Sequence, residues 1–178
     1  MLLAQQADTK TKCENMPKLR TFIKFKDFSN TPSYLTKPLS FIQRKFLAKI
    51  RLGCLELRIE TGRYSRPRLP EEARTCLVCQ NQVIENEAHF LFSCQTYQAE
   101  RLAWTQNLTL PDNFLNLPET EKLNLVLNIH TNVKLTAQYI INIFDKRSKV
   151  VKILPNTMYE NPVLYRLEPH GQCPVSLG

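Results

Sequence analysis

The sequence predicts a mainly α-helical fold: a small helical domain with a single zinc-stabilised CCHC module and little β-structure. Apolar residues recur at helical spacing through much of the 178-residue chain. Only four residues are glycine, which argues against folds rich in β-hairpins. Three of the six cysteines and one histidine lie within residues 76–94, where a metal ion would organise the chain.

Two helices are expected in the N-terminal part. Residues 1–14 are polar, and we expect them to be flexible. A first helix is expected from Pro17 to Phe28, because proline is tolerated in the first turn of a helix. The second begins at Ser40, which forms a capping-box pattern with Gln43. An apolar stripe and a glycine stop complete its pattern: Ile42, Phe46, Leu47, Ile50 and Gly53.

Residues 55–70 have a different pattern. Leu55, Leu57 and Ile59 alternate with charged residues, which predicts a short strand or extended segment. The prolines and arginines of residues 65–70 then indicate an extended basic connector. Residues 15–70 are therefore expected to form a basic helical segment and connector.

The CCHC module and the helix that follows it are expected within residues 71–110. This helix should begin near Glu85 to Glu87, run past Trp104 and bend near Cys94.

Residues 111–154 are expected to form a C-terminal helical pair. One helix runs from Pro118 to Asn128, with acidic residues in its first turn. The other begins at Val133 and ends in the basic run 146–149. Residues 155–178 contain four prolines and predict an irregular tail.

Cys76, Cys79, His89 and Cys94 have the spacing of a zinc site. Gaps of two, nine and four residues separate them. Three sulfurs and one nitrogen complete a tetrahedron and leave no position for a catalytic water. We therefore expect one structural Zn²⁺, whose removal should unfold residues 71–100. The alternative is that they are buried free thiols and a core histidine.

The last two ligands set a geometric condition. Positions 89 and 94 lie about 140° apart around an ideal α-helix. Cys94 should therefore lie where the helix distorts or ends.

The basic charge of the chain is concentrated in one third of its length. The formal net charge is +8, with 24 Lys and Arg against 16 Asp and Glu. Residues 18–74 hold fourteen of the basic and five of the acidic residues, a balance of +9, and the rest balances to −1. A localised basic region is typical of a polyphosphate partner. The alternative is a basic surface that serves solubility.

Two sequence runs resemble a known family: LAKIRLGCLELRIETGRY (Leu47–Tyr64) and CLVCQNQVIENEAHFLFSC (Cys76–Cys94). Together they resemble the region downstream of the polymerase in non-LTR retrotransposon reverse transcriptases. The resemblance covers roughly residues 17–148 and extends more loosely to Lys18–Phe28 and to Phe144–Arg147. It implies the same four zinc ligands, and an intact protein that copies RNA into DNA while this region helps to hold template or target. None of the four aspartates are adjacent, so we expect a truncated copy that lacks the polymerase core.

RNA or DNA is the expected partner, bound with little sequence dependence because nothing here reads base edges. Arginine suits phosphate because its planar fork forms two hydrogen bonds at once. Alternatives are core packing for Tyr64, and pairing of Arg58 or Arg63 with Glu56 or Glu60. The candidate binding residues are Arg44, Lys45, Lys49, Arg51, Arg58, Arg63, Tyr64, Arg66 and Arg68.

Other functions find little support in the sequence. It has neither a G-x-x-x-x-G-K loop nor an H-E-x-x-H motif, so we expect no catalysis and no small-molecule substrate. The alternatives are a protein-interaction module that exposes Phe90, Leu91 and Phe92, or a functionless translated retroelement remnant. Without a secretory signal or an apolar run of about 18 residues, the chain is expected to be cytoplasmic or nuclear, with no membrane partner.

Overall fold

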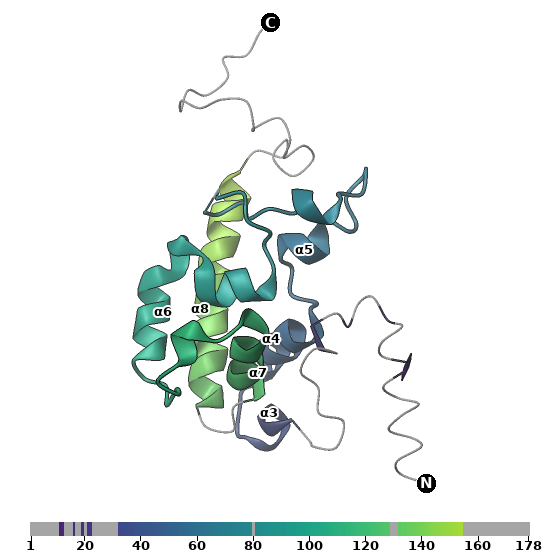
Figure 1. Cartoon of the computed structure of the whole chain (residues 1–178). Helices are drawn as coiled ribbons and strands as arrows, with labels where there is room; N and C mark the ends of the chain where they lie inside the picture. Colours follow the sequence, from purple (N-terminus) through teal and green to yellow (C-terminus); the bar gives the residue numbers. More distant parts are fainter. Residues whose placement is uncertain are drawn as a thin grey trace, which may run out of the picture.

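The computed structural model describes residues 11–12, 16, 19, 21–22, 32–79, 81–128 and 132–154. Within these residues the fold is mainly α-helical and contains no β-sheet, which confirms the predicted class (Figure 1). The tail lies outside the described residues, and so do all but a few residues of the N-terminal segment and of the first expected helix. The α-helices are α3 (Ser33–Thr36), α4 (Phe41–Leu52), α5 (Arg58–Thr61), α6 (Gln98–Thr105), α7 (Glu119–Asn128) and α8 (Val133–Ile153). Shorter turns are η2 (Glu71–Ala73), η3 (His89–Ser93), η4 (Gln95–Tyr97) and η5 (Phe114–Asn116).

Local signals set both ends of α4. The Ser40 hydroxyl accepts from the Gln43 backbone N–H at 3.2 Å, and the Gln43 side chain accepts from the Ser40 N–H at 3.0 Å. Gly53 ends the helix with φ 72°, a left-handed conformation that glycine adopts without steric cost. The capping box and the glycine stop are therefore confirmed. The apolar stripe is partly wrong, because Ile42 is 56% exposed.

The strand predicted around Leu55, Leu57 and Ile59 is wrong. All three side chains are buried, so their alternation reports burial correctly. The backbone nevertheless bends and enters α5 at Arg58. Glu85 supplies the contacts that a partner strand would have made: its carboxylate accepts from the Arg58 N–H at 2.6 Å, and its carbonyl from the Ile59 N–H at 3.1 Å.

The connector after α5 is held by a buried arginine. Arg74 donates to the Leu69 carbonyl at 2.9 and 3.1 Å and to the Ile59 carbonyl at 3.1 Å. Gly62 lies against this side chain, and a Cβ there would come within 2.7 Å of the Arg74 Cγ. The connector therefore packs around the buried Arg74 side chain and does not extend away from the fold.

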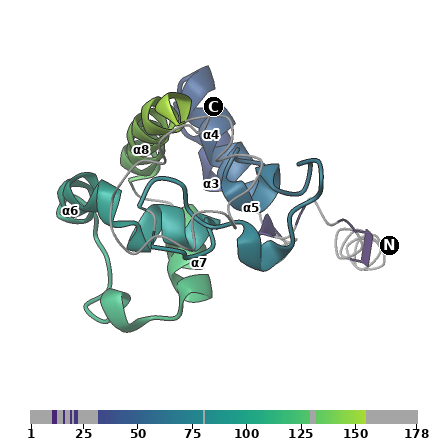
Figure 2. The same cartoon turned by 90° about the horizontal axis from the view of Figure 1, so that it is seen from above.

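α8 is the central element of the fold and packs against both α4 and α6 (Figures 1 and 2). The Trp104 ring in α6 stacks on the Tyr139 ring in α8 at 4.2 Å between centroids. α8 continues beyond the predicted basic run to Ile153, and Leu154 is extended because it precedes a proline. α7 has the predicted bounds.

One apolar core joins α4, α6, α7 and α8. It runs from Leu47 to Ile143 and includes the ligand residues Cys76 and Cys94. The CCHC segment is therefore part of the main core. None of the described helices is long and apolar enough to cross a lipid bilayer.

Candidate metal centre

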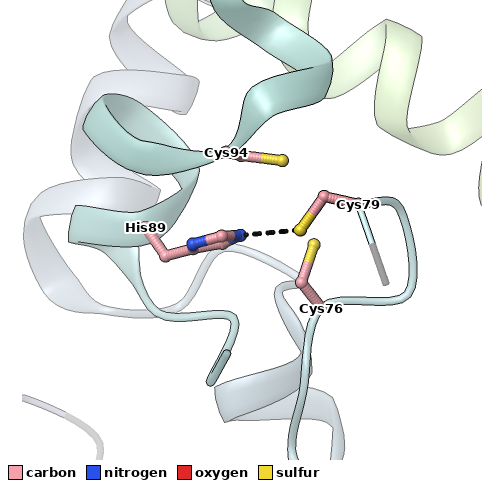
Figure 3. A group of neighbouring side chains, drawn as sticks. All are labelled: Cys76, Cys79, His89 and Cys94. Carbon is pink, nitrogen blue, oxygen red and sulfur yellow. Dashed lines mark hydrogen bonds between the residues drawn. The ribbon is translucent and has the colours of Figure 1, made fainter. Parts of the chain in front are cut away.

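Four side chains from two short segments converge on one point (Figure 3). Thr75 and Ile84 form an antiparallel bridge, and the Cys76 N–H donates to the Val83 carbonyl at 2.8 Å. This pairing holds a turn at residues 77–79 that aims Cys76 and Cys79 inward. His89 and Cys94 approach from the opposite side. The four ligand atoms all lie within 4.8 Å of one another.

A π-helical turn brings His89 and Cys94 to the same side. In η3 the Cys94 N–H donates to the His89 carbonyl at 2.8 Å, five residues earlier. This wider turn reduces the offset of about 140° that an α-helix would impose. Cys94 itself is extended, so the prediction that it lies where the helix distorts and ends is confirmed.

The end of the π-helical turn is stabilised by side chains from other helices. The Tyr139 hydroxyl donates to the Leu91 carbonyl at 2.6 Å, and the Arg101 Nε donates to the same carbonyl at 3.1 Å. Arg101 also donates to the Cys94 carbonyl. These bonds satisfy carbonyls that lack partners at a helix end, so α6 and α8 both fix the position of the fourth ligand.

The donor atoms fit a tetrahedral zinc ion. The Cys79 Sγ lies 3.4 Å from the His89 Nε2. Zinc bonds of about 2.3 Å to sulfur and 2.05 Å to nitrogen place such a pair about 3.6 Å apart. The His89 Nδ1 is buried and has no hydrogen-bond partner in the described structure, which leaves Nε2 as the atom that faces the cluster. Three sulfurs and an imidazole suit zinc and do not suit Mg²⁺ or Ca²⁺.

Burial closes the site to solvent. Cys76, His89 and Cys94 are buried and Cys79 is half-buried. A hydrogen bond between two thiols raises the pKa of Cys76 and lowers the pKa of Cys94, and desolvation raises the pKa of Cys79. A bound metal ion would displace the thiol protons, because the thiolate is the ligand.

Glu85 and Arg147 support the cluster, and sequence reasoning missed both. The Arg147 Nε and Nη2 each donate to Glu85 carboxylate oxygens at 2.7 Å, and both residues are buried. One of these oxygens lies 3.8 Å from the Cys76 Sγ. A signal was present, because Arg147 closes the run Phe144–Arg147 that extends the family resemblance.

Two predicted phosphate contacts, Arg51 and Arg58, have buried side chains, which argues against a role for them at the surface. Arg51 is 3% exposed; it donates to the Leu127 carbonyl, and its guanidinium lies 5.3 Å from the centroid of the Tyr34 ring. Desolvation lowers the pKa of Arg51. Arg58 is 2% exposed and lies beneath the surface at the start of α5.

Three further candidates make intramolecular contacts. Arg44 donates to the carbonyls of Leu35, Lys37 and Leu39, which ties the segment before α4 to that helix. The Lys49 Nζ lies 2.7 Å from a Glu56 carboxylate oxygen. Arg63 pairs with Glu60 at 3.2 Å, the alternative expected for that arginine.

The remaining candidates are exposed. Lys45 lies on the outer face of α4, and Arg66 and Arg68 lie in the connector. Tyr64 is 61% exposed, so core packing does not explain it. Its hydroxyl contacts the Glu60 carboxylate at 3.3 Å. These four residues form the accessible part of the predicted set.

The apolar patch expected at residues 90–92 is wrong. Phe90 and Leu91 are fully buried, and Phe92 packs between Trp104 and Phe114. The protein-interaction alternative therefore loses the surface on which it was based.

Comparisons with protein-family models, with curated proteins and with solved structures find no match for this chain. The structure establishes a small helical protein with a buried Cys-Cys-His-Cys group that could bind one metal ion. The retrotransposon resemblance stays a prediction from sequence motifs.

Proposed function

We propose that the chain is a non-catalytic, zinc-stabilised module that binds nucleic acid, like the region downstream of the polymerase in non-LTR retrotransposon reverse transcriptases. The observation that carries the proposal is the convergence of three thiols and one imidazole in a buried cluster. Four protein ligands leave no open position for a reactive water, which favours a structural over a catalytic zinc.

The metal would connect the turn at residues 77–79 to the end of η3. The Thr75–Ile84 bridge lies at the base of this turn, and Val78 and Cys79 pack against the apolar core. Zinc therefore fixes the segment that lies next to the exposed connector residues. A stable platform lowers the entropic cost of binding a flexible strand.

The nucleic-acid part of the proposal rests on the localised basic charge and on the cations that stay accessible. With Arg51 and Arg58 buried, the surface cations that remain from the predicted set include Lys45, Arg66 and Arg68. Their partners would be phosphates, and binding would depend strongly on salt and weakly on sequence.

The test combines metal analysis with titration of the full chain. We expect one zinc per chain, and binding of single-stranded or duplex oligonucleotides that weakens linearly on a log–log plot against salt. Replacing Lys45 and Arg68 together with glutamine should reduce the magnitude of that slope by about 1.4 to 1.8, because two phosphate contacts are lost.

A matched control removes the same charge elsewhere. The double variant Lys134→Gln/Lys149→Gln changes two exposed lysines of α8 instead. We expect this variant to leave the salt dependence of binding nearly unchanged. Folded, zinc-loaded protein that binds no oligonucleotide at low salt would contradict the nucleic-acid proposal and favour a functionless remnant. Metal-free protein that is fully folded would contradict the zinc proposal.

A further inference from the structure

A hollow of about 490 Å³ opens where the connector, the metal-binding turn and the end of α8 meet. Figure 1 shows α5 beside the C-terminal end of α8. Leu77 of the turn and Val151 of α8 contribute half-buried apolar walls, and Tyr64 and Arg66 contribute exposed side chains from the connector. The volume is within the range of about 300–1,000 Å³ that is usual for ligand sites.

The lining combines an aromatic ring with positive charge. The accessible charge is that of Arg66, because Arg58 and Arg147 are buried and Arg147 pairs with Glu85. The lining has one carboxylate, that of Glu56. The Glu56 charge is offset by Lys49 at 2.7 Å. Tyr64 is anchored at its hydroxyl by Glu60, so its ring is held at one end while most of the residue stays exposed. A ligand that suits this lining has a flat aromatic part and a negative part.

We infer that the hollow seats an unpaired base of a single-stranded nucleic acid, which stacks on Tyr64 while Arg66 contacts the adjoining phosphate. This inference rests on the proposed function and names the site and the strand form. A duplex keeps its bases stacked on one another, whereas a single strand can turn a base onto a protein ring. Stacking tolerates any base, which agrees with the absence of base-edge readers in the sequence.

The test compares three probes with the zinc-loaded full chain: a single strand, its duplex, and a strand of the same length made of stable abasic units. Tyr64→Ala should weaken binding of the single strand by about 5- to 150-fold, which corresponds to the loss of one stacked base. It should leave the abasic strand and the duplex unchanged. Tyr64→Phe keeps the stacking ring and loses only the hydroxyl contact with Glu60, so it should bind the single strand much more tightly than Tyr64→Ala.

Two further variants separate the contributions. Arg66→Gln should weaken the normal and abasic single strands alike, because it removes a phosphate contact. Phe41→Ala removes another highly exposed aromatic ring, at the start of α4, and should change nothing. A 5-iodouracil strand should form a photo-crosslink at Tyr64, located by mass spectrometry. DNA and RNA versions of each probe show which sugar the site accepts.

The outcomes distinguish this inference from the proposal beneath it. If the parent binds and folded, zinc-loaded Tyr64→Ala binds the single strand equally well, the hollow is not a base site and the proposed function stands. If Tyr64→Ala weakens binding of the abasic strand as much as binding of the normal single strand, the hollow accepts polyanions in general and the inference is overturned. If the parent binds none of the oligonucleotides, the proposed function fails and the inference fails with it.

Discussion

Glu85 connects three parts of the molecule through one carboxylate. Two hydrogen bonds come from Arg147 and a third from the Arg58 backbone N–H at 2.6 Å. Three thiolates around one Zn²⁺ leave a net negative charge, and a carboxylate beside Cys76 would add to it. Burial alone would lower the pKa of Arg147, but the bonded carboxylate outweighs it and raises that pKa, so the guanidinium stays charged and offsets one of these two negative charges.

Glu85→Gln should be strongly destabilising. The amide keeps the size of the side chain but leaves the buried Arg147 charge without an anion, which typically costs about 3–5 kcal/mol in the free energy of unfolding. Urea unfolding of zinc-loaded protein measures the loss. Glu56→Gln is the matched control: its side chain is 63% exposed, and the loss of its pair with Lys49 should cost less than about 1 kcal/mol. Equal losses of stability in the two variants would show that the buried Glu85–Arg147 pair contributes no more than the exposed Glu56–Lys49 pair.

The convergence of the CCHC side chains was predictable from the sequence at this scale, and the burial of Arg51 and Arg58 was not. A two-residue gap between Cys76 and Cys79 constrains geometry locally, so spacing alone indicates a shared ion. The burial of Arg51 depends on the Leu127 carbonyl, 76 residues away in the chain. The residues near Arg51 in the sequence do not indicate that contact. The sequence pattern of a basic face on α4 is the same whether solvent or α7 covers that face.

At the scale of single elements, helix ends follow the sequence closely. Ser40, Gln43 and Gly53 set the bounds of α4 by bonds that span four residues or fewer. The strand expected at residues 55–59 failed for the opposite reason. A strand and a bent, buried segment can both show alternating apolar residues. The contacts with Glu85 that favour the bent segment come from a residue distant in the sequence.

Ser40→Ala should cost about 1 kcal/mol in the free energy of unfolding, because α4 loses the acceptor for one of its first N–H groups. Ser148→Ala provides a comparison within a helix, where the hydroxyl only donates to the Phe144 carbonyl at 2.8 Å. Such a bond adds little to helix stability, so we expect a change near zero. Urea midpoints of both variants, measured with zinc bound, give the comparison. A loss at Ser148 as large as that at Ser40 would argue against the cap.

At the scale of the whole molecule, the candidate metal site and the apolar core share side chains. Cys76 and Cys94 belong to the same apolar cluster as Leu47 and Ile143. Domain boundaries drawn from the sequence separate these residues, because proline and glycine positions do not reveal which segments share a core. Loss of metal should therefore affect helices outside the ligand segment.

Chelation should lower the melting temperature of the entire chain, beyond residues 71–100. Ligand binding adds about 1.4 kcal/mol of stability per tenfold excess of free zinc over its dissociation constant. Trp104 is the one tryptophan of the chain and lies in α6, so its emission reports on a helix without ligands. Cys79→Ser should abolish the zinc dependence, and Cys54→Ser should retain it. If a strong chelator changes neither the Trp104 emission nor the melting temperature, the metal site and the helical core are not coupled.

The distance in sequence between Glu85 and Arg147 has a consequence for synthesis. Glu85 leaves the ribosome 62 residues before its guanidinium partner, and Tyr139 follows the Leu91 carbonyl by 48 residues. The cysteines can meet a metal ion early, but the nascent turn stays uncovered until α8 has been translated. A chain stalled before that helix would present its thiols to oxidants and its aromatic residues to chaperones.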